Sequence, residues 1–573
     1  MKKKWLTGIL LINISISVSL AQVSNASMFS SPLKIPLNIS GGFGEIRTNH
    51  IHSGIDFRTG GEIGKTVLAA ADGFISRIKI EPGGFGKAIY IDHPEGYTTV
   101  YGHLDALRDD LTEYIRKQQY EYQLFTVDLF PKKTDFIVKK GDSIAYSGNA
   151  GGSQGPHLHF EIRETVKQSP IQPLLFKLPI RDTKSPSFYG LTVYPLSKYS
   201  RVEGSEKKIN FQTVPVGKNF SINHGVIKVS GPIGFGAQVF DAVDSDATRT
   251  GFYMLTMNID SVMIYKNEIA SFSFGESRYI NSMIDYAEYM KSRKKITKLY
   301  IDPNNKLSIY KTSVNKGIIE FRDTLVHNVE VTAFDTYGNK STLNFKIKST
   351  NNNSAILNDS SECLRTFSFL KENIFTADNF KLLIPLNALY TDICFRFATK
   401  PGKPGYYSKI YQVGDSSIPV QFPFEISIKP ENLSPSLLEK ALIVRFDDGN
   451  PNNIGGTIDK DFVKGKTYIM GSFAVTIDTT PPRIVPYRSF STSYQGIRKI
   501  YIAFKITDNL SGIRDYNGFI DGKWALFEYD AKNNLMLHQI DNSRFKYNAG
   551  TNIKIVVSDS KNNTTTLETK YRP

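Results

Sequence analysis

Histidines and acidic residues gather in the first third of the chain, in patterns that could bind a metal ion. Six of the 9 histidines precede residue 160. These are His50, His52, His93, His103, His157 and His159. In the segment NHIHSGIDF, alternate residues of an extended strand share a face, so His52 and Asp56 are expected to point the same way. Gly54 lies between them on that face and would leave room for an ion.

A second pattern lies in the segment GPHLHFEI. His157, His159 and Glu161 share one face of the predicted strand, and the intervening side chains are apolar. A His-x-His pair on a strand can direct two imidazoles into one cleft. His103, in VYGHL, ends another predicted strand and is a third candidate. Two imidazoles and one carboxylate are the ligand set of a catalytic zinc site, which keeps a further position open for water.

A compact β domain over about residues 31–180 is expected to position these candidates. Short runs such as GKTVLAAADGFISRIKI end at Gly or Asp-Gly turns and predict strands. Residues 105–122 are the exception, because Leu107, Leu111 and Ile115 recur at helical spacing. We predict an all-β domain with one short helical insertion.

The motifs of this segment resemble those of the lysostaphin/LytM-type zinc metalloendopeptidases, which cut bacterial cell-wall peptides. HSGID, ADG, YGHL and SGNAGGSQGPHLHFEIR occur in the family's order over about residues 40–165. The resemblance implies an antiparallel β fold with an open groove over one Zn²⁺. It implies that this ion is bound by His52, Asp56 and His159.

The resemblance also implies roles for residues that do not bind the metal. His103 and His157 match the family's catalytic pair, which helps to activate the zinc-bound water and to stabilise the tetrahedral intermediate. Zinc lowers the pKa of bound water to about 7, and an ordinary histidine titrates near 6.5, so both suit proton transfer at neutral pH. Arg47 matches a position near the groove that could hold a substrate carboxylate, whereas His50 and His93 are expected at the surface.

Beyond residue 180, alternating strand patterns dominate and two segments repeat. DTKSP at residues 182–186 resembles DTTPP at 478–482. VTAFDTYGNKSTL and IVVSDSKNNTTTL then resemble each other as the last hairpins of two β-sandwiches. A helical pattern within 279–295 enlarges the first copy. We predict a β-sandwich domain with an insertion (182–350), a β-rich domain (351–477) and an Ig-like β-sandwich domain (478–573).

The N-terminus and the composition predict an exported protein. Lys2, Lys3 and Lys4 precede an apolar run and a small-x-small site, so residues 1–21 are expected to be a cleaved signal peptide. The mean hydropathy of −0.26 excludes a multi-span membrane protein. The net charge of +15 suits an anionic envelope polymer, and export argues against nucleic acid as a partner. Cys363 and Cys394 could form a disulfide or remain free thiols.

These observations predict a zinc peptidase of the periplasm, the cell envelope or the extracellular space. The expected reaction is hydrolysis of peptide bonds in peptidoglycan cross-links or stem peptides. The alternative is a non-catalytic envelope protein that binds the cell wall or activates an amidase, and a complete set of ligands favours the enzyme. The C-terminal domains could bind envelope protein partners or act as an adhesin. We expect residues 22–187 to fold alone; the bond cut, latency and oligomeric state are left open.

Overall fold

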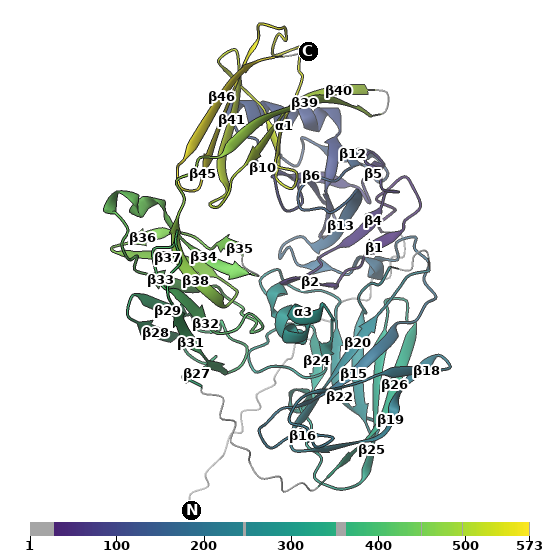
Figure 1. The fold of residues 1–573 in the computed structure, drawn as a ribbon. Coiled ribbons are helices and arrows are strands. Elements are labelled where there is room, and N and C mark those ends of the chain that lie inside the picture. Colours follow the sequence, from purple (N-terminus) through teal and green to yellow (C-terminus); the bar gives the residue numbers. More distant parts are fainter. Residues whose placement is uncertain (1–27, 245–247, 351–362, 448–449, 495–496, 572–573) are drawn as a thin grey trace, which may run out of the picture.

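The computed structural model is built mainly from β-strands, which confirms the all-β prediction (Figure 1). It describes residues 28–244, 248–350, 363–447, 450–494 and 497–571. The predicted signal peptide, residues 1–21, lies outside the described residues. Within those ranges, no helix combines the length and the apolar character needed to cross a membrane.

The N-terminal region contains one large antiparallel sheet, a small sheet and a hairpin. The large sheet has the strand order β1 (Ile39–Gly41), β4 (Ile55–Arg58), β13 (His157–Glu164), β8 (Tyr97–Gly102), β7 (Lys87–Asp92), β6 (Gly73–Ile80) and β10 (Val127–Leu129), with β11 (Ile137–Val138) beside β6 and β14 (Pro170–Ile171) beside β13. The small sheet has the order β5 (Thr66–Leu68), β12 (Ser143–Ser147) and β9 (Leu104–Leu107), and the hairpin is β2 (Ile46–Arg47) with β3 (His50–Ile51). A 3₁₀ turn, η1 (Pro173–Phe176), ends the region.

The helical insertion predicted within residues 105–122 is present as α1 (Asp109–Tyr122). Leu111 and Ile115 are buried, as their spacing predicts, because they form the apolar face of the helix. The helix begins later than the pattern, since Leu107 belongs to β9 and pairs with Ala145 of β12.

The second region, residues 187–349, has two sheets and a short helical segment. One sheet has the order β17 (Ile209–Phe211), β15 (Ser187–Pro195), β20 (Ile233–Phe240) and β23 (Thr297–Lys298). The other has the order β16 (Arg201–Val202), β19 (Asn219–Ser230), β26 (Lys340–Ser349), β25 (Val326–Phe334), β21 (Met254–Ile259), β22 (Val262–Glu268) and β24 (Tyr310–Ser313), with β18 (Thr213–Val216) beside β19. The helical pattern near 279–295 forms η2 (Ser277–Tyr279), α2 (Ile280–Met283) and α3 (Tyr286–Ser292).

The third region has two five-stranded sheets and a short strand pair. The first sheet has the order β28 (Asn373–Ala377), β29 (Phe380–Ile384), β33 (Phe424–Ile428), β37 (Phe462–Thr467) and β36 (Thr457–Asp459), and the second has the order β31 (Phe397–Lys400), β32 (Ile410–Val413), β38 (Gly471–Ile477), β34 (Ala441–Asp447) and β35 (Asn450–Asn453). The short pair is β27 (Arg365–Phe367) with β30 (Ile393–Phe395). Cys363 and Cys394 form a disulfide here, which answers the question that the sequence left open.

The fourth region has two four-stranded sheets. One has the order β39 (Arg483–Tyr494), β40 (Ile497–Thr507), β44 (Leu535–Gln539) and β43 (Glu528–Asp530), and the other has the order β42 (Lys523–Ala525), β41 (Ile513–Ile520), β45 (Asn552–Asp559) and β46 (Thr564–Lys570). The two hairpins predicted from the repeat are both present, as β25–β26 and β45–β46.

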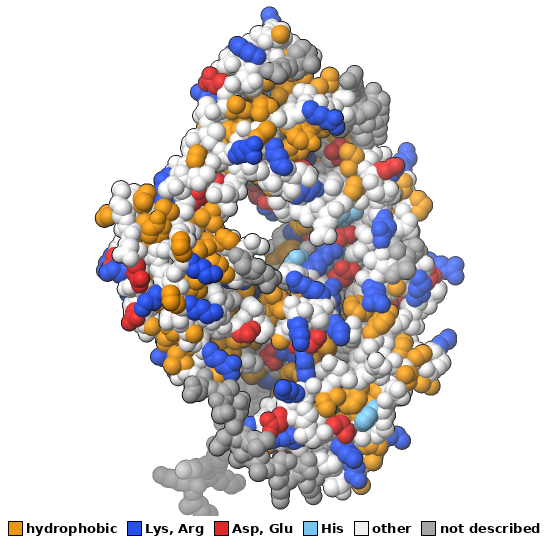
Figure 2. Space-filling model, in the orientation of Figure 1, with side chains coloured by type: hydrophobic (Ala, Val, Ile, Leu, Met, Phe, Trp, Pro, Cys, Tyr) orange, Lys and Arg blue, Asp and Glu red, His pale blue; other side chains and the backbone are white. Residues whose placement is uncertain are grey.

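The four regions close into a ring around an opening that passes through the molecule (Figure 2). Between the second and third regions, Arg278 Nε donates to Val420 O at 2.8 Å. Between the third and fourth, Lys440 Nζ donates to Asn563 Oδ1 at 2.6 Å. The fourth region returns to the first, where Lys87 and Glu528 form an ion pair. The first region is therefore held by neighbouring regions on two sides.

The first two regions share one hydrophobic core, which runs from Phe29 to Ile347 and also includes Tyr390 of the third region. Phe43 packs on Phe272 with their ring centroids 5.3 Å apart. The backbone nitrogen of Ile51 donates to Ser277 Oγ at 2.8 Å. This packing favours the view that the second region stabilises the first, rather than following it as an independent module.

We predict that residues 22–187 alone are less stable than residues 22–350. Truncation removes the Ser277 hydroxyl that accepts from the Ile51 N–H, and it exposes Phe43, whose burial contributes about 1.5–3 kcal/mol. Thermal unfolding of the two fragments measures the difference. Phe272→Ala in the longer fragment is the control and should lower its midpoint in the same direction. Equal midpoints for the two fragments would instead support independent folding of the first region.

Candidate metal centre

The register between β4 and β13 brings two of the predicted ligands together. Asp56 of β4 lies directly opposite His159 of β13. The neighbouring residues Phe57 and Phe160 are fully buried on the other face, and this anchors both strands in the core. Because side chains alternate along a strand, burial of the phenylalanines turns Asp56 and His159 toward the groove.

His52 reaches the same point from the turn before β4. The segment from His50 to Asp56 is not one strand, as the sequence analysis expected, because β3 ends at Ile51 and β4 begins at Ile55. Gly54 also has a different role from the one expected. A Cβ atom there would lie 2.5 Å from Phe160 O and 2.9 Å from His159 Cε1. The missing side chain makes room for β13 rather than for an ion.

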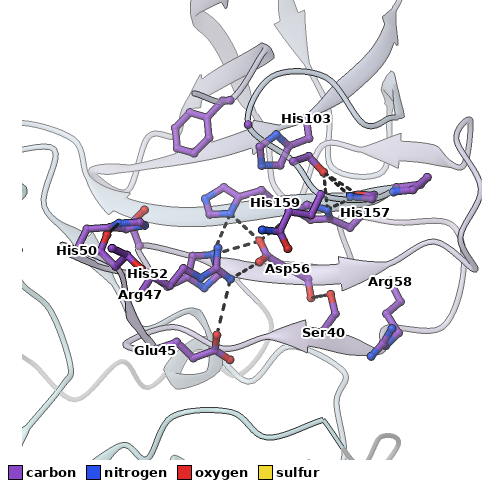
Figure 3. A pocket seen from close by; sticks show the side chains of 18 of the residues that line it. Ser40, Glu45, Arg47, His50, His52, Asp56, Arg58, His103, His157 and His159 are labelled. Carbon is purple, nitrogen blue, oxygen red and sulfur yellow. Dashed lines mark hydrogen bonds and ion pairs between the residues drawn. The ribbon is translucent and has the colours of Figure 1, made fainter. Parts of the chain in front are cut away.

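Three potential ligand atoms converge in this centre (Figure 3). His52 Nε2 lies 3.2 Å from His159 Nδ1 and 3.2 Å from Asp56 Oδ1. His159 Nδ1 lies 2.8 Å from the same Asp56 oxygen. Two imidazole nitrogens and a carboxylate oxygen gathered around one point are a donor set that suits zinc. The structure thus brings the three predicted ligands together.

Outer contacts fix which nitrogen of each histidine faces the centre. His52 Nδ1 is 2.7 Å from Gly42 O, and a carbonyl can only accept, so Nδ1 carries the proton and Nε2 presents its lone pair. His159 Nε2 lies 2.8 Å from Glu161 Oε1, which orients Nδ1 toward Asp56. Such a carboxylate–histidine contact is typical of metal centres. Glu161, which the sequence placed on the same face, therefore has a supporting position.

Glu161 is itself held in place by two further side chains. Arg163 Nε donates to one carboxylate oxygen at 2.5 Å and Ser53 Oγ donates to the other at 2.6 Å. Burial disfavours the ionised form, but the charges and hydrogen bonds of Arg163 and His159 together outweigh it and lower the pKa of Glu161 to about 2. Glu161 thus stays an anion and accepts from His159 at neutral pH.

The protonation of the two ligand histidines reflects their different partners. Burial lowers the pKa of His52 to about 4, so its imidazole is neutral at pH 7 and free to bind a cation. Burial also opposes charge on His159, yet hydrogen bonds to Asp56 and Glu161 outweigh it and raise its pKa to about 9. A proton therefore occupies His159 in the metal-free protein, and metal binding would release it.

The predicted catalytic pair lies beside the three ligands. The rings of His103 and His157 are 4.7 Å apart, and His157 Nε2 lies 3.4 Å from Asp56 Oδ1. Both Nδ1 atoms lie 2.8 Å from a backbone carbonyl, that of Ala150 for His103 and that of Gly155 for His157. Each Nδ1 therefore carries a proton, which leaves each Nε2 able to accept one from a reacting group.

His103 has a backbone conformation that few residues other than glycine adopt. It follows the end of β8 with a φ of 59°, and its backbone nitrogen donates to Phe85 O at 2.9 Å. Burial, together with the nearby charges of His159 and His157, lowers the pKa of His103 to about 3. A strained backbone at a buried, neutral imidazole is a feature common at functional sites.

Three further residues of the sequence analysis lie in different settings. Arg47 Nη2 donates to Asp56 Oδ2 at 2.5 Å, so it holds a ligand carboxylate instead of standing free for substrate. His50 is exposed, as expected. His93 was expected at the surface, and that is wrong. It is 5% exposed, because its two ring nitrogens bond Asp72 O and Thr99 Oγ1 inside the first region.

The centre lies in a groove of about 1200 Å³ whose walls come from more than one region. The loop around Gly152–Gly155 forms one wall. Tyr289 of α3 and Lys295 form part of another, and both belong to the second region. Tyr289 Oη lies 3.0 Å from Thr48 Oγ1, which fixes it against the β2–β3 hairpin. Neither residue is predicted from the sequence, because the only signal in that segment is a helical pattern.

The loop wall is also contacted by the fourth region. Lys532 Nζ bonds to Asn149 O and lies 3.3 Å from Ser153 O. Ser153 is itself a groove residue, and its Oγ lies 3.2 Å from His157 Nδ1. Lys532 of the fourth region thus supports the loop that contacts the candidate catalytic residue His157.

Family models match two parts of the chain. Peptidase family M23 matches residues 50–120 and 112–173, and a Zu5-like domain matches residues 364–478. The first match covers the β3–β14 segment that contains all five candidate site residues. The second covers the third region.

Individual proteins match the same N-terminal segment. An uncharacterized metalloprotease of Haemophilus influenzae is 34% identical over 128 residues, which are 22% of this chain and 21% of that protein. The DD-carboxypeptidase/endopeptidase Mpg of Neisseria meningitidis is 31% identical over 134 residues, 23% of this chain and 24% of that protein. The similarity thus spans about a quarter or less of each relative.

A solved structure covers a similar share of the chain. The catalytic domain of the antimicrobial peptidase lysostaphin from Staphylococcus simulans is 25% identical, covers 24% of this chain and 87% of that domain, and has a TM-score of 0.17. The matching family model and the named metalloprotease relatives agree with the motifs HSGID and GPHLHFEI. The chain therefore carries a peptidase family M23 domain of the LytM type over residues 50–173.

Proposed function

We propose that this chain is an exported zinc metalloendopeptidase that hydrolyses peptide bonds in peptidoglycan cross-links or stem peptides. The observation that carries the proposal is the convergence of His52 Nε2, Asp56 Oδ1 and His159 Nδ1 within 3.2 Å in an open groove. Three protein ligands beside a groove are typical of catalytic zinc, whereas structural zinc is usually enclosed by four.

The donor set and its surroundings fit zinc. His52, Asp56 and His159 would hold the ion, and Gly42 O and Glu161 would keep the two imidazoles in the binding tautomer. Zinc, when bound, supplies a Lewis acid that activates water and polarises a carbonyl.

His103 and His157 supply the proton transfers in this proposal. With each Nδ1 donating to a backbone carbonyl, each imidazole can take a proton at Nε2 and pass it to the leaving amine. Once protonated, either ring can donate to the negative oxygen of the tetrahedral intermediate. The contact between Arg47 and Asp56 fixes the carboxylate during these steps.

The groove supports a peptide substrate that carries carboxylates. Its volume of about 1200 Å³ exceeds that of usual small-molecule pockets and suits an extended chain. Lys295 lines it from the second region and can pair with a free carboxylate of a stem peptide. Relatives named as a DD-carboxypeptidase/endopeptidase support the same substrate class. An envelope location follows from that substrate, and possible protein partners of the C-terminal regions belong to the same proposal.

We predict that His159→Ala removes zinc and turnover together. The substitution deletes one of three ligands and leaves Asp56 with a single imidazole partner in the centre. Plasma mass spectrometry of the purified protein should find one zinc per chain in the wild type and little in the variant. His50→Ala, an exposed histidine of the same groove, is the matched control and should retain the metal. Full zinc content in His159→Ala would refute the ligand assignment.

We predict that His103→Ala and His157→Ala keep zinc but reduce kcat by roughly 10²–10⁴-fold each, the usual range for a lost proton carrier or oxyanion donor. Zinc content and turnover are measured on the same preparations. Zinc loss in either variant would indicate that the replaced histidine is itself a metal ligand.

The proposed substrate is tested by digesting purified peptidoglycan with the mature chain. Mass spectrometry of the soluble products should reveal fragments cut at a peptide bond, and far fewer of them after the same time with the His157→Ala protein. If the wild type releases nothing but stimulates an added amidase, the non-catalytic alternative is correct. The fragments also identify the bond that is cut.

A further inference from the structure

Two clusters of buried carboxylates lie outside the groove, one in each of the repeated regions. The first comprises Asp182, Asp241 and Asp335, and the second comprises Asp478, Asp508 and Asp559. Within each cluster, one oxygen of each carboxylate lies within 4.8 Å of the others. Five of the six side chains are at least nine-tenths buried, and Asp508 is partly buried. Like charges so close together in a protein interior repel strongly unless a cation or protons compensate them.

The two clusters have the same supporting hydrogen bonds. In the first, Asn339 Nδ2 donates to Asp182 O at 3.2 Å and to Asp335 Oδ2 at 2.7 Å. The backbone nitrogens of Tyr337 and Asn339 donate to the other oxygen of Asp335. The backbone nitrogen of Lys184 donates to Asp182 Oδ1.

In the second cluster, Asn563 Nδ2 donates to Asp478 O at 2.9 Å and to Asp559 Oδ2 at 2.7 Å. The nitrogens of Lys561 and Asn563 donate to Asp559 Oδ1. The nitrogen of Thr480 donates to Asp478 Oδ1. The short sequence repeat therefore encodes the same arrangement of side chains twice.

The third carboxylate of each cluster has an oxygen without a partner. Asp241 Oδ1 is inaccessible and makes no hydrogen bond within the described part of the chain, and Asp241 as a whole is 7% exposed. Asp508 Oδ1, at the corresponding place in the second cluster, is likewise inaccessible and unpartnered among the described residues. Leaving a buried carboxylate oxygen unpaired is costly, so its recurrence in both copies indicates a ligand that the two sites share.

The first cluster shows how strongly its charges interact. Burial, and then the charge of Asp182, raises the pKa of Asp241 to about 8. Burial also raises the pKa of Asp182 to about 6, with Asp335 contributing.

We propose that each cluster binds one calcium ion through its three aspartates. The donors are oxygens alone, with no histidine or cysteine in either cluster, which favours a hard cation over zinc. Calcium accepts the irregular geometry of carboxylates and carbonyls better than magnesium, which demands near-ideal octahedra. Calcium sites of extracellular modules bind at about 10⁻⁴–10⁻³ M, so these ions would be bound outside the cytoplasm.

The positions of the two sites indicate what the ions stabilise. Asp182 lies where the chain passes from the first to the second region, and Tyr337 Oη donates to Ile180 O at 3.0 Å across that joint. Asp478 lies where the chain passes from the third to the fourth region, next to the bond from Lys440 Nζ to Asn563 Oδ1. Calcium at these sites would fix two joints of the ring, the one between the first and second regions and the one between the third and fourth.

The test uses the full mature chain loaded with zinc and freed of calcium. Equilibrium dialysis with radioactive calcium, up to about 5 mM, counts the bound ions. Calorimetry then follows the unfolding temperature with calcium and, for comparison, with magnesium. We expect two calcium ions per chain and a rise of about 5–10 °C in the transitions of the sandwich regions.

Single substitutions identify the sites. Asp241→Asn and Asp508→Asn should each leave one calcium ion, and the double variant none. Asp459→Asn, which removes an exposed carboxylate paired with Lys464, is the control and should keep both. In calcium-free buffer Asp241→Asn relieves repulsion and should not lower the unfolding temperature, so lost binding is distinguished from misfolding. Two ions retained by the double variant, or no calcium bound by the wild type at 5 mM, would overturn the proposal. Neither readout depends on peptidase activity.

Discussion

The antiparallel register of β4 against β13 is the constraint on which the rest of the centre depends. It places Asp56 opposite His159 while Phe57 and Phe160 fill the core on the other face. A slip by one residue would exchange the two faces, turning Asp56 and His159 into the apolar core and the phenylalanines toward the groove. The hydrophobic core thus fixes the positions of the site residues. Only one register buries the two phenylalanines and also turns Asp56 and His159 toward the groove.

That register alone does not make a metal centre, since imidazoles rotate and exchange tautomers. A hydrogen-bond acceptor at the outer nitrogen of each ring fixes the orientation and the tautomer of that ring. Gly42 O fixes His52, Glu161 fixes His159, and Arg163 keeps Glu161 ionised although it is wholly buried. An unpaired carboxylate at that depth would be very costly, so Arg163 and Ser53 support the orientation of the candidate ligand His159 through Glu161.

The sequence predicts local features of this protein well and long-range contacts poorly. Strand alternation in GPHLHFEI places His157, His159 and Glu161 on one face, as the structure has them, and the helical spacing of Leu111 and Ile115 predicts α1. The break between His52 and Ile55 was missed because the alternation continues through the turn. His93 was misassigned because its partners, Asp72 O and Thr99 Oγ1, become neighbours only when the sheet forms. The groove residues Tyr289 and Lys295 lie more than 200 positions from His52, and no spacing rule reaches that far.

The same long-range contacts link the C-terminal regions to the chemistry. Tyr289 and Lys295 bring one wall of the groove from the second region, and Lys532 supports the opposite loop from the fourth. A change at either joint of the ring would therefore move a groove wall relative to the metal ligands, whose own positions depend on the sheet. A displacement of about 1 Å in a substrate-positioning group can cost 10²-fold in rate, so under the proposed function the rigidity of those joints would affect turnover. The repeated aspartate clusters lie at two of those joints, so the same short motif recurs where the chain enters the second region and where it enters the fourth.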